Sequence, residues 1–369
     1  MRHFTVLLLL VLAVVLPSIN ANPYSYSSSR QTDPGDGPGG VDNDGPGGVD
    51  DDDPGADGNV PDLGDGNGIP DVSNATNPLC VPWYGIRDAI LGGIFHGRCG
   101  DEARASVRLA FHDAGTFSDA LKAQGLPNGA ADGSMIWDPT EVLRTENDGL
   151  QPIVSILSPL PAQFGVSPGD LLHLAGVLGV LACPGGPRIN AFIGRPFPLN
   201  VAPMGLLPSP EDPVPKLIAR FADMGFTVRD LMALVGAHST GKQRFVDPAL
   251  ANSSFDSTVD IWDVRFYAET AAPTTPPDVL KLDSDVNFSH NASTFHEFHR
   301  FINNQEDWDE DYRSAHLKMM LLGQNISTLT NCTELMPASI NLTNLTINGT
   351  VDPTLLEAAI QKYRAPWLS

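Results

Sequence analysis

The segment VRLAFHD, residues 107–113, places an arginine, an aromatic residue and a histidine close together on a predicted helix. Arg108 and His112 are four residues apart and Phe111 lies between them, so the three side chains point in nearly the same direction. An arginine beside a histidine suits a bound anion, a developing charge or a bound ligand. The competing interpretation is a structural core histidine beside an exposed arginine, which an isolated Arg-x-x-x-His pattern favours.

A second histidine, His238, lies in the segment LVGAHSTGK. Leu231, Leu234, Val235 and His238 recur at helical intervals, which predicts that this histidine lies on a buried helix face. A lone buried histidine commonly bonds a backbone carbonyl instead of serving a ligand. Two helices that each present one histidine from an apolar face can, however, enclose a flat cofactor with iron at its centre.

The elements that must position these residues are helices, because alternating strand patterns are short and rare in this chain. Thr227 and Asp230 match a capping box, and Gly241 suits the end of the helix that they begin. Acidic residues open the segment 101–115 and Gly115 closes it, as the helix dipole favours. The sequence therefore predicts a mainly α fold. The expected helices cover residues 101–115, 168–182, 214–223, 227–241 and 295–322.

The first part of the chain differs in composition from the rest. Residues 1–21 combine a basic start, an apolar run and a small-residue exit, which is typical of a cleaved secretory signal. Residues 22–77 are rich in Asp, Gly and Pro and predict a disordered linker. Residues 30–71 hold 12 Asp and one Arg, so they contribute −11 of the net charge of −22. The segment 62–71 resembles a calcium loop but lacks the closing glutamate, which favours a solvated spacer.

Residues 78–369 form the expected folded domain, and several features of it indicate export. Four cysteines permit two disulfides with three possible pairings. No basic cluster supports nucleic-acid binding, and no segment is apolar enough for a membrane helix. We expect a secreted protein that binds neither nucleic acid nor membrane. The glycosylation sequons begin at Asn74, Asn252, Asn287, Asn291, Asn325, Asn331, Asn341, Asn344 and Asn348.

The segments RLAFHD, LVGAHSTGK and CPGGPRINAFIGRP resemble the distal, proximal and linking motifs of the plant-type haem peroxidase superfamily, most closely its secreted fungal class II branch. The similarity runs from about Cys80 to about Met336 in the same order and spacing. It implies a mainly α fold that holds haem b between distal and proximal helical halves. It also implies two calcium ions, hydrogen peroxide as oxidant, small reducing substrates and a monomer.

The resemblance assigns a role to each histidine. It makes His238 the proximal ligand of haem iron, with Asp285 as its carboxylate partner and Asp283 as the reserve candidate. It makes His112 the general base and then general acid for peroxide. The remaining distal residues are Arg108 for charge stabilisation, Phe111 packing over the haem, Asn147 fixing the histidine tautomer and Glu141 supporting Asn147.

The family pattern also implies the metal and disulfide sets, with ligands that are all oxygen atoms, as calcium prefers. The alternative for the metal sets is a group of caps and turns without metal. The distal calcium ligands would be Asp113, Ala130 through its carbonyl, Asp132 and Ser134. The proximal ligands would be Ser239, Asp256, Thr258, Ile261 through its carbonyl and Asp263. The disulfides would be Cys99–Cys183 and Cys80–Cys332.

The positions that define the donor are atypical. In the resemblance, the three carboxylate positions of manganese oxidisers hold Asp101, Ala105 and Arg244, so one acid remains. Ala233 stands where lignin oxidisers carry a surface tryptophan. The sequence therefore favours oxidation of small phenols and dyes at the haem edge.

Two rival interpretations remain open at this stage. One is a calcium-stabilised secreted glycoprotein that keeps the fold and acts in binding with little turnover. The other is a transition-metal site in SHNASTFHEFH, although a solvated helix face explains that segment better. The histidines of this segment are His290, His296 and His299.

Overall fold

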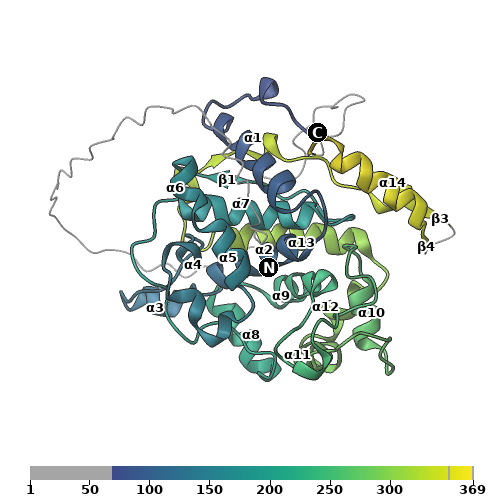
Figure 1. Ribbon diagram of the computed structural model, residues 1–369. Helices are drawn as coiled ribbons and strands as arrows, with labels where there is room; N and C mark the ends of the chain where they lie inside the picture. Colours follow the sequence, from purple (N-terminus) through teal and green to yellow (C-terminus); the bar gives the residue numbers. More distant parts are fainter. Residues whose placement is uncertain (1–68, 348–349, 368–369) are drawn as a thin grey trace, which may run out of the picture. The chain divides into compact units, whose positions relative to one another are not determined.

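The computed structural model describes residues 69–347 and 350–367, which belong to the compact unit spanning residues 55–369. The expected signal, and the expected linker up to residue 68, lie outside the described residues. The last part of the expected disordered linker, residues 69–77, is instead ordered: it contains the 3-10 helix η1 (Val72–Asn74), and the Thr76 backbone N–H donates to the Glu334 carboxylate at 3.0 Å. The α-helices are α1 (Val81–Asp88), α2 (Asp101–Ala114), α3 (Asp119–Ala123), α4 (Ser134–Trp137), α5 (Gln151–Leu157), α6 (Leu160–Phe164), α7 (Pro168–Leu181), α8 (Val214–Asp223), α9 (Val228–Val235), α10 (Arg265–Ala271), α11 (Asp283–His290), α12 (Phe295–Arg300), α13 (Gln305–Met320) and α14 (Pro353–Arg364). Figure 1 shows their arrangement, with long irregular connections between them.

Short elements complete the fold. The 3-10 helices are η1 (Val72–Asn74), η3 (Glu141–Leu143), η4 (Thr145–Asn147), η5 (Gly236–Thr240), η6 (Pro248–Leu250), η7 (Ile326–Thr328), η8 (Thr333–Leu335), η9 (Leu342–Leu345) and η10 (Ala365–Trp367), and η2 (Ala89–Ile94) is a π-helix. Strands β1 (Phe192–Ile193) and β2 (Thr330–Asn331) pair antiparallel with Phe192 opposite Asn331. Strands β3 (Thr346–Ile347) and β4 (Thr350–Val351) form a second antiparallel pair. The fold is mainly α, as the sequence predicts.

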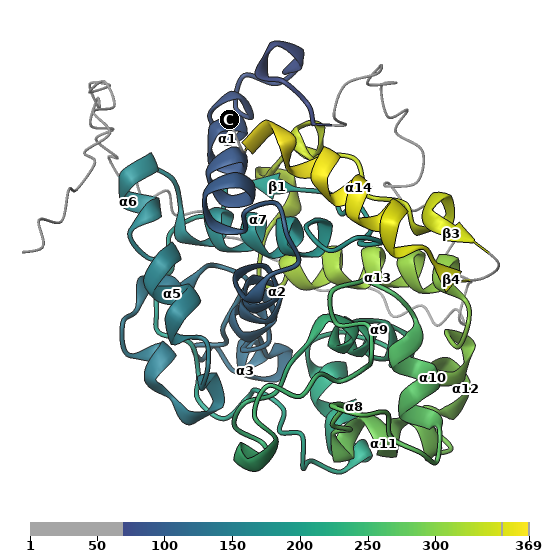
Figure 2. The same cartoon turned by 45° about the vertical axis from the view of Figure 1, so that its right-hand side comes forward.

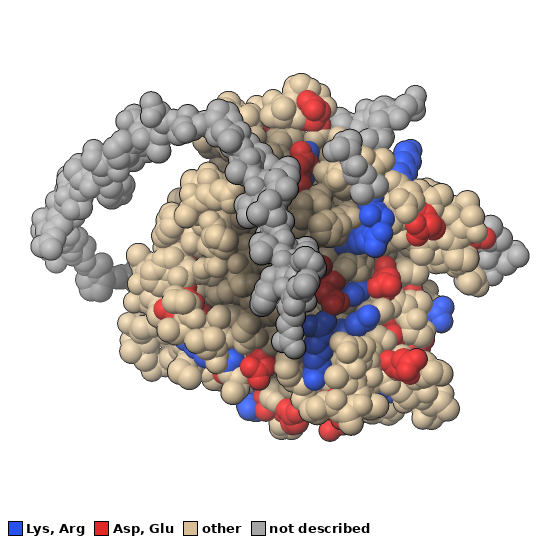
Figure 3. All heavy atoms as spheres, viewed as in Figure 1, with Lys and Arg blue, Asp and Glu red and all other residues tan. Residues whose placement is uncertain are grey.

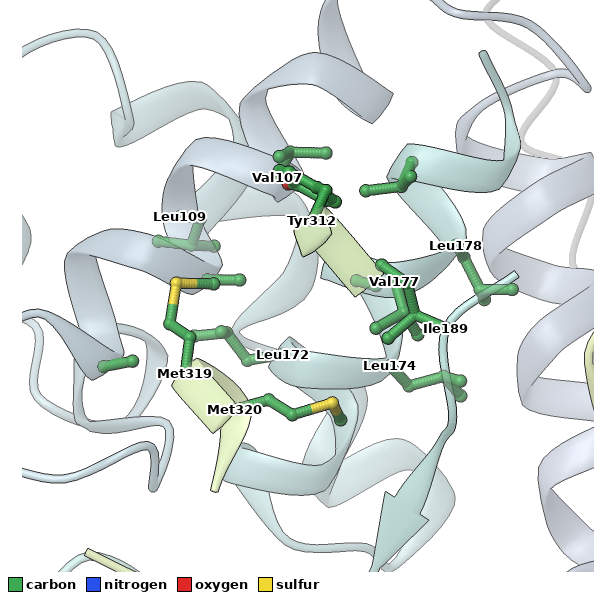
Figure 4. Packing of buried hydrophobic residues seen from close by; sticks show 14 of the residues in the cluster. Val107, Leu109, Leu172, Leu174, Val177, Leu178, Ile189, Tyr312, Met319 and Met320 are labelled. Carbon is green, nitrogen blue, oxygen red and sulfur yellow. The ribbon is translucent and has the colours of Figure 1, made fainter. Parts of the chain in front are cut away.

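The centre of the core is helix α7, which packs mainly against α2 (Figure 2). Every residue of α7 is buried, because its small and aliphatic residues cover all sides of the helix. Gly176 lets α2 approach closely, since a Cβ there would lie 2.7 Å from the Ala110 side chain. Figure 4 shows aliphatic and sulfur-containing side chains of α2, α7 and α13 filling the space between these helices. This packing fixes α2, which carries Arg108 and His112.

Two predicted helices differ from the structure. The α-helix expected over 227–241 ends at Val235 and continues as the 3-10 turn η5, which carries His238. The expected helix over 295–322 is divided into α12 and α13, because Asn303 has a φ of 58° and takes the chain out of the right-handed helix. The Thr227 and Asp230 capping box is present in both directions, and such a cap contributes about 1 kcal/mol.

Both disulfides have the pairing that the family resemblance implies. Cys80 is bonded to Cys332, and Cys99 is bonded to Cys183. The second bridge ties the residues just before α2 to the end of α7, so it reinforces the packing of these helices.

The described surface carries charges of both signs. On the face seen in Figure 3, lysines and arginines are interspersed with aspartates and glutamates. Within residues 69–347 and 350–367, no helix is long and apolar enough to cross a bilayer.

Candidate active site

Helix α2 places His112 in its last turn, where the imidazole is buried. His112 Nδ1 lies 2.8 Å from Asn147 Oδ1. Burial, and secondarily the charge of Arg108, lower the pKa of His112 to about 3. The imidazole is therefore neutral at ordinary pH. Because the amide oxygen can only accept, Nδ1 carries the hydrogen and Nε2 keeps a free lone pair.

The amide of Asn147 is itself held in place by a backbone group. Asn147 Nδ2 donates to the Glu141 carbonyl oxygen at 2.8 Å, so Glu141 orients this amide through its backbone. The Glu141 carboxyl is buried without a hydrogen-bond partner among the described residues. Burial raises the pKa of that carboxyl to about 7. Sequence reasoning named Glu141, and the structure adds that its carbonyl makes the contact.

Arg108 and Phe111 flank His112 on the same helix. Arg108 donates from its guanidinium to the Asp148 carbonyl at 2.8 Å and keeps solvent-accessible surface. Surrounding protein nevertheless lowers its pKa to about 10, so the group stays cationic at neutral pH. The Phe111 ring meets His112 edge-on at 5.9 Å and stacks on Phe221 at 6.0 Å. An accessible cation thus lies beside a neutral base and an apolar ring.

The second histidine, His238, is bonded to a carboxylate and not to an amide. His238 Nδ1 lies 2.9 Å from Asp285 Oδ2, and the Asp285 side chain is buried. Asp283, the reserve candidate, is exposed. The His238 side chain is 35% exposed, which differs from the buried position that its helical spacing predicts. This accessibility leaves Nε2 available, and no described residue forms a hydrogen bond with it.

This donor set fits the iron of a haem. A histidine whose Nδ1 is bonded to a buried carboxylate has a fixed tautomer and presents a more basic Nε2 lone pair. His238 has this arrangement, and the Phe255 and Phe266 rings pack around it at centroid distances of 5.0 Å and 5.7 Å. His238 is therefore the residue that could bind the metal, and His112 is the residue that could move a proton.

The residue after His112 belongs to a buried polar group. Asp113 accepts from the Gly133 N–H at 2.9 Å, and its Oδ1 lies 3.4 Å from the Ser134 hydroxyl. Burial raises the pKa values of Asp113 and Asp132, and for Asp132 the charge of Asp113 adds to the effect. The Ala130 carbonyl makes no hydrogen bond within this group. Sequence reasoning missed His173, whose Nε2 lies 3.0 Å from Asp113 Oδ2; its only signal is a histidine inside the apolar run of α7.

The residue after His238 also joins a group of oxygen atoms. The Ser239 hydroxyl donates to Asp256 Oδ2 at 2.8 Å and lies 3.4 Å from the Ile261 carbonyl. The Thr258 hydroxyl donates to Asp263 Oδ1 at 3.1 Å. Burial raises the pKa of Asp256 to about 7 and also raises that of Asp263. All five oxygen donors that the sequence suggests are thus brought into one cluster.

Neither oxygen cluster contains many carboxylates. Within the described ranges, no group of three or more His, Cys, Asp or Glu residues is arranged to hold a metal ion. Each cluster has two carboxylates, and its other oxygen atoms belong to hydroxyl and carbonyl groups, so a search for acidic or histidine ligands alone would not find it.

The residues at the positions that distinguish manganese and lignin oxidisers make other contacts. Asp101 is paired with Arg104 at 2.9 Å and with Arg244 at 2.7 Å. Ala233 is fully buried, and its carbonyl accepts from Trp308 Nε1 at 2.9 Å.

The three histidines near α12 do not converge. His290 Nδ1 contacts the Val286 carbonyl at 2.9 Å, His299 Nε2 contacts the Ser289 carbonyl at 2.9 Å, and the His296 ring is exposed. The structure therefore offers no support for a transition-metal site in this segment.

Comparison with known proteins gives one family. The peroxidase family model matches residues 88–307. A ligninase of Phanerodontia chrysosporium is 34% identical over 299 residues, covering 76% of this chain and 80% of the ligninase. A versatile peroxidase of Pleurotus eryngii is 34% identical, covering 72% and 77%. A manganese peroxidase of Phlebia radiata is 33% identical, covering 72% and 79%.

The family match spans the segments that carry Arg108, His112, His238 and Asp285, and the relatives do not favour a binding protein without turnover. The chain belongs to the peroxidase family and is a haem peroxidase.

Proposed function

We propose that this peroxidase reduces hydrogen peroxide at His112 and Arg108 and oxidises small phenolic or dye-like donors in one-electron steps. The observation that carries the proposal is the difference in histidine partners, an amide for His112 and a buried carboxylate for His238. When bound, haem b would supply the redox chemistry, giving up two electrons to each peroxide and regaining them one at a time from donors.

His112 acts on the protons of peroxide. Its neutral Nε2 accepts a proton from one peroxide oxygen and returns it to the other as the O–O bond breaks. Asn147 holds the tautomer that leaves Nε2 free for this transfer. Arg108 stabilises the negative charge that develops on the departing oxygen, and Phe111 limits water near the reacting atoms.

His238 would hold the haem iron through Nε2. Asp285 supports this role because it fixes the hydrogen on Nδ1 and raises the basicity of the opposite nitrogen.

Two calcium ions would brace the two histidine segments. The distal ion would bind Asp113, Asp132, Ser134 and the Ala130 carbonyl, next to His112. The proximal ion would bind at Ser239, next to His238, and the raised pKa of Asp256 supports a cation there, since a divalent ion relieves the cost of a buried carboxylate. The other proximal ligands would be Asp256, Thr258, Ile261 and Asp263.

The class of reducing substrate follows from the residues that stand where manganese and lignin oxidisers carry their donor sites. Manganese(II) needs free hard oxygen ligands, whereas Asp101 is engaged by two arginines and Ala105 offers no side-chain oxygen. A buried alanine at position 233 cannot serve as a surface redox residue. Direct electron transfer from small aromatic donors at the haem edge is the route that these residues leave.

We further propose that the protein is secreted as a monomer, with residues 1–21 as signal, 22–77 as linker and 78–369 as the peroxidase domain. Two disulfides support an oxidising destination.

A donor profile tests this proposal. The purified haem-loaded protein is given peroxide with a phenol, with Mn²⁺ or with a bulky non-phenolic aromatic ether. We expect saturable turnover of the phenol alone. Saturable oxidation of Mn²⁺ would contradict the assignment at Asp101, Ala105 and Arg244, and the R244D variant then serves as a matched comparison.

A further inference from the structure

Beside the proximal histidine, large aromatic side chains fill the space around α13. The rings of Trp262 and Trp308 stack with centroids 4.9 Å apart and planes 8° apart. The Tyr312 ring meets Trp262 edge-on at 4.6 Å and Trp308 at 5.9 Å. All three side chains are at most 1% exposed. Packing accounts for the stacking itself, whereas the polar contacts of the cluster point to a further role.

The first of these contacts is a hydrogen bond between Tyr312 and His316. The Tyr312 hydroxyl lies 3.1 Å from His316 Nδ1, and both residues are buried. Burial, and secondarily His173, lower the pKa of His316 to about 3, so its ring is neutral and Nδ1 can accept. A tyrosine that loses an electron becomes a strong acid, and a buried one needs a proton acceptor within hydrogen-bond reach. His316 provides that acceptor.

The second observation is a pair of unpartnered ring nitrogens. His316 Nε2 and His173 Nδ1 are both buried without a hydrogen-bond partner among the described residues. His173 Nε2 donates to the Asp113 carboxylate, which leaves His173 Nδ1 without a hydrogen. His316 accepts from Tyr312 at Nδ1, so its hydrogen is on Nε2. Among the described residues, Tyr312 is therefore the hydrogen-bond partner of the His316 ring, and no other group competes for Nδ1.

The third observation links the cluster to the proximal histidine. Trp308 Nε1 donates to the Ala233 carbonyl at 2.9 Å. The indole also lies directly against Gly236, two residues before His238, because a Cβ added at Gly236 would collide with Trp308 Nε1. A second path for an electron runs through neighbouring rings. The His238 and Phe266 ring centroids are 5.7 Å apart, and those of Phe266 and Tyr267 are 5.3 Å apart.

We propose that Trp308, Trp262 and Tyr312 form an internal one-electron donor site, which is oxidised when peroxide is present and no external donor is. The inference rests on the proposed function, since peroxide turnover supplies the oxidant. Tyr312 would give up one electron, by way of Trp308, to the haem that peroxide has oxidised, and its hydroxyl proton would move to His316 Nδ1. The products are a neutral tyrosyl radical and a protonated His316. A phenol later returns one electron, and the proton moves back to Tyr312.

Electron paramagnetic resonance of the haem-loaded protein, frozen after addition of peroxide alone, tests this site. The main variant is Y312F, which keeps the ring and removes the hydroxyl. The matched control is Y363F, because Tyr363 is also buried but contacts Trp367 instead of this cluster, and its hydroxyl has no hydrogen-bond partner among the described residues. Growth with ring-deuterated tyrosine identifies the signal, since only a tyrosyl spectrum narrows. The Soret band of each sample reports whether peroxide has reacted.

We expect a tyrosyl signal in the wild type and in Y363F that disappears on addition of phenol. In Y312F that signal should be lost, and H316L should reduce it while Tyr312 stays in place. A wild-type Soret change without an organic radical, or an unchanged tyrosyl signal in folded Y312F, would overturn the inference and leave the proposed function standing. Absence of any Soret change would overturn both.

Discussion

His112 and His238 are the same residue type near the ends of two helices, yet they differ in burial and in the chemistry of the group that bonds Nδ1. His112 is buried, with its Nδ1 hydrogen on the neutral amide of Asn147. His238 is one-third exposed, with its Nδ1 bonded to the carboxylate of Asp285. The amide fixes the tautomer and favours the imidazolium less than burial and Arg108 disfavour it, whereas a carboxylate increases electron donation from the opposite nitrogen. In the proposed function, the partner therefore separates a proton carrier from a metal ligand.

The largest effect should come from removing the proton carrier. H112Q keeps a polar side chain but no base, so the rate of reaction with peroxide should fall by about 10²–10⁴-fold. Stopped-flow recording of the Soret band measures this rate, and H296Q is the control because the His296 ring is exposed. A peroxide rate within a few-fold of wild type, with normal haem content, would contradict the role of His112.

Removal of calcium should weaken both histidine segments together, since one oxygen cluster adjoins each. At a calcium concentration of about 100 Kd, each site would contribute about 2.7 kcal/mol to the free energy of unfolding. Thermal unfolding with and without a chelator measures the change. Magnesium added back serves as the control, and an unchanged Tm after verified chelation would count against both calcium sites.

Exchanging the proximal partner should have a smaller effect. D285N makes the environment of His238 resemble that of His112, and loss of such a partner costs about 10–100-fold in metal affinity or activity. Haem retention and the iron reduction potential measure this change, and we expect the potential to rise. The neighbouring exposed residue provides the control as D283N. Equal behaviour of both variants would remove the distinction between Asp285 and Asp283.

Exchanging the distal partner should shift a pH profile. With Asn147 the pKa of His112 is about 3, so the peroxide reaction should persist in acid and be lost as pH falls through that value. In N147D a carboxylate favours the imidazolium and should raise the pKa by about 1–3 units. The acidic limb of the rate profile should then move to higher pH by that amount, and the rate at high pH should change little. An unmoved limb would mean that Asn147 does not control His112.

The sequence predicts the elements that rest on local patterns. The spacing in VRLAFHD, the Thr227 capping box and the motifs around His238 are local, so the helices follow from them, whereas the roles of the site residues come from the family resemblance. The division of 295–322 at Asn303 and the change to a 3-10 turn at Gly236 depend on backbone choices that side-chain periodicity does not encode.

Contacts between distant segments were harder to predict. His173 lies 60 residues from Asp113 in sequence, and the apolar residues around it in α7 do not predict their contact. The Trp262 and Trp308 stack likewise joins a loop to α13. The sequence pattern also does not predict the exposure of His238. The pattern identifies an apolar helix face but does not say whether protein or a ligand covers it.

The most direct test of the division between the two histidines is the Soret spectrum of wild type, H112Q and H238A. We predict that wild type and H112Q bind haem, that only wild type shifts rapidly with one equivalent of peroxide, and that a phenol restores its spectrum. H238A should fail to retain haem in the wild-type coordination state. If H112Q instead loses the haem and H238A keeps the wild-type spectrum and peroxide reaction, the assignment of proton carrier and metal ligand is contradicted.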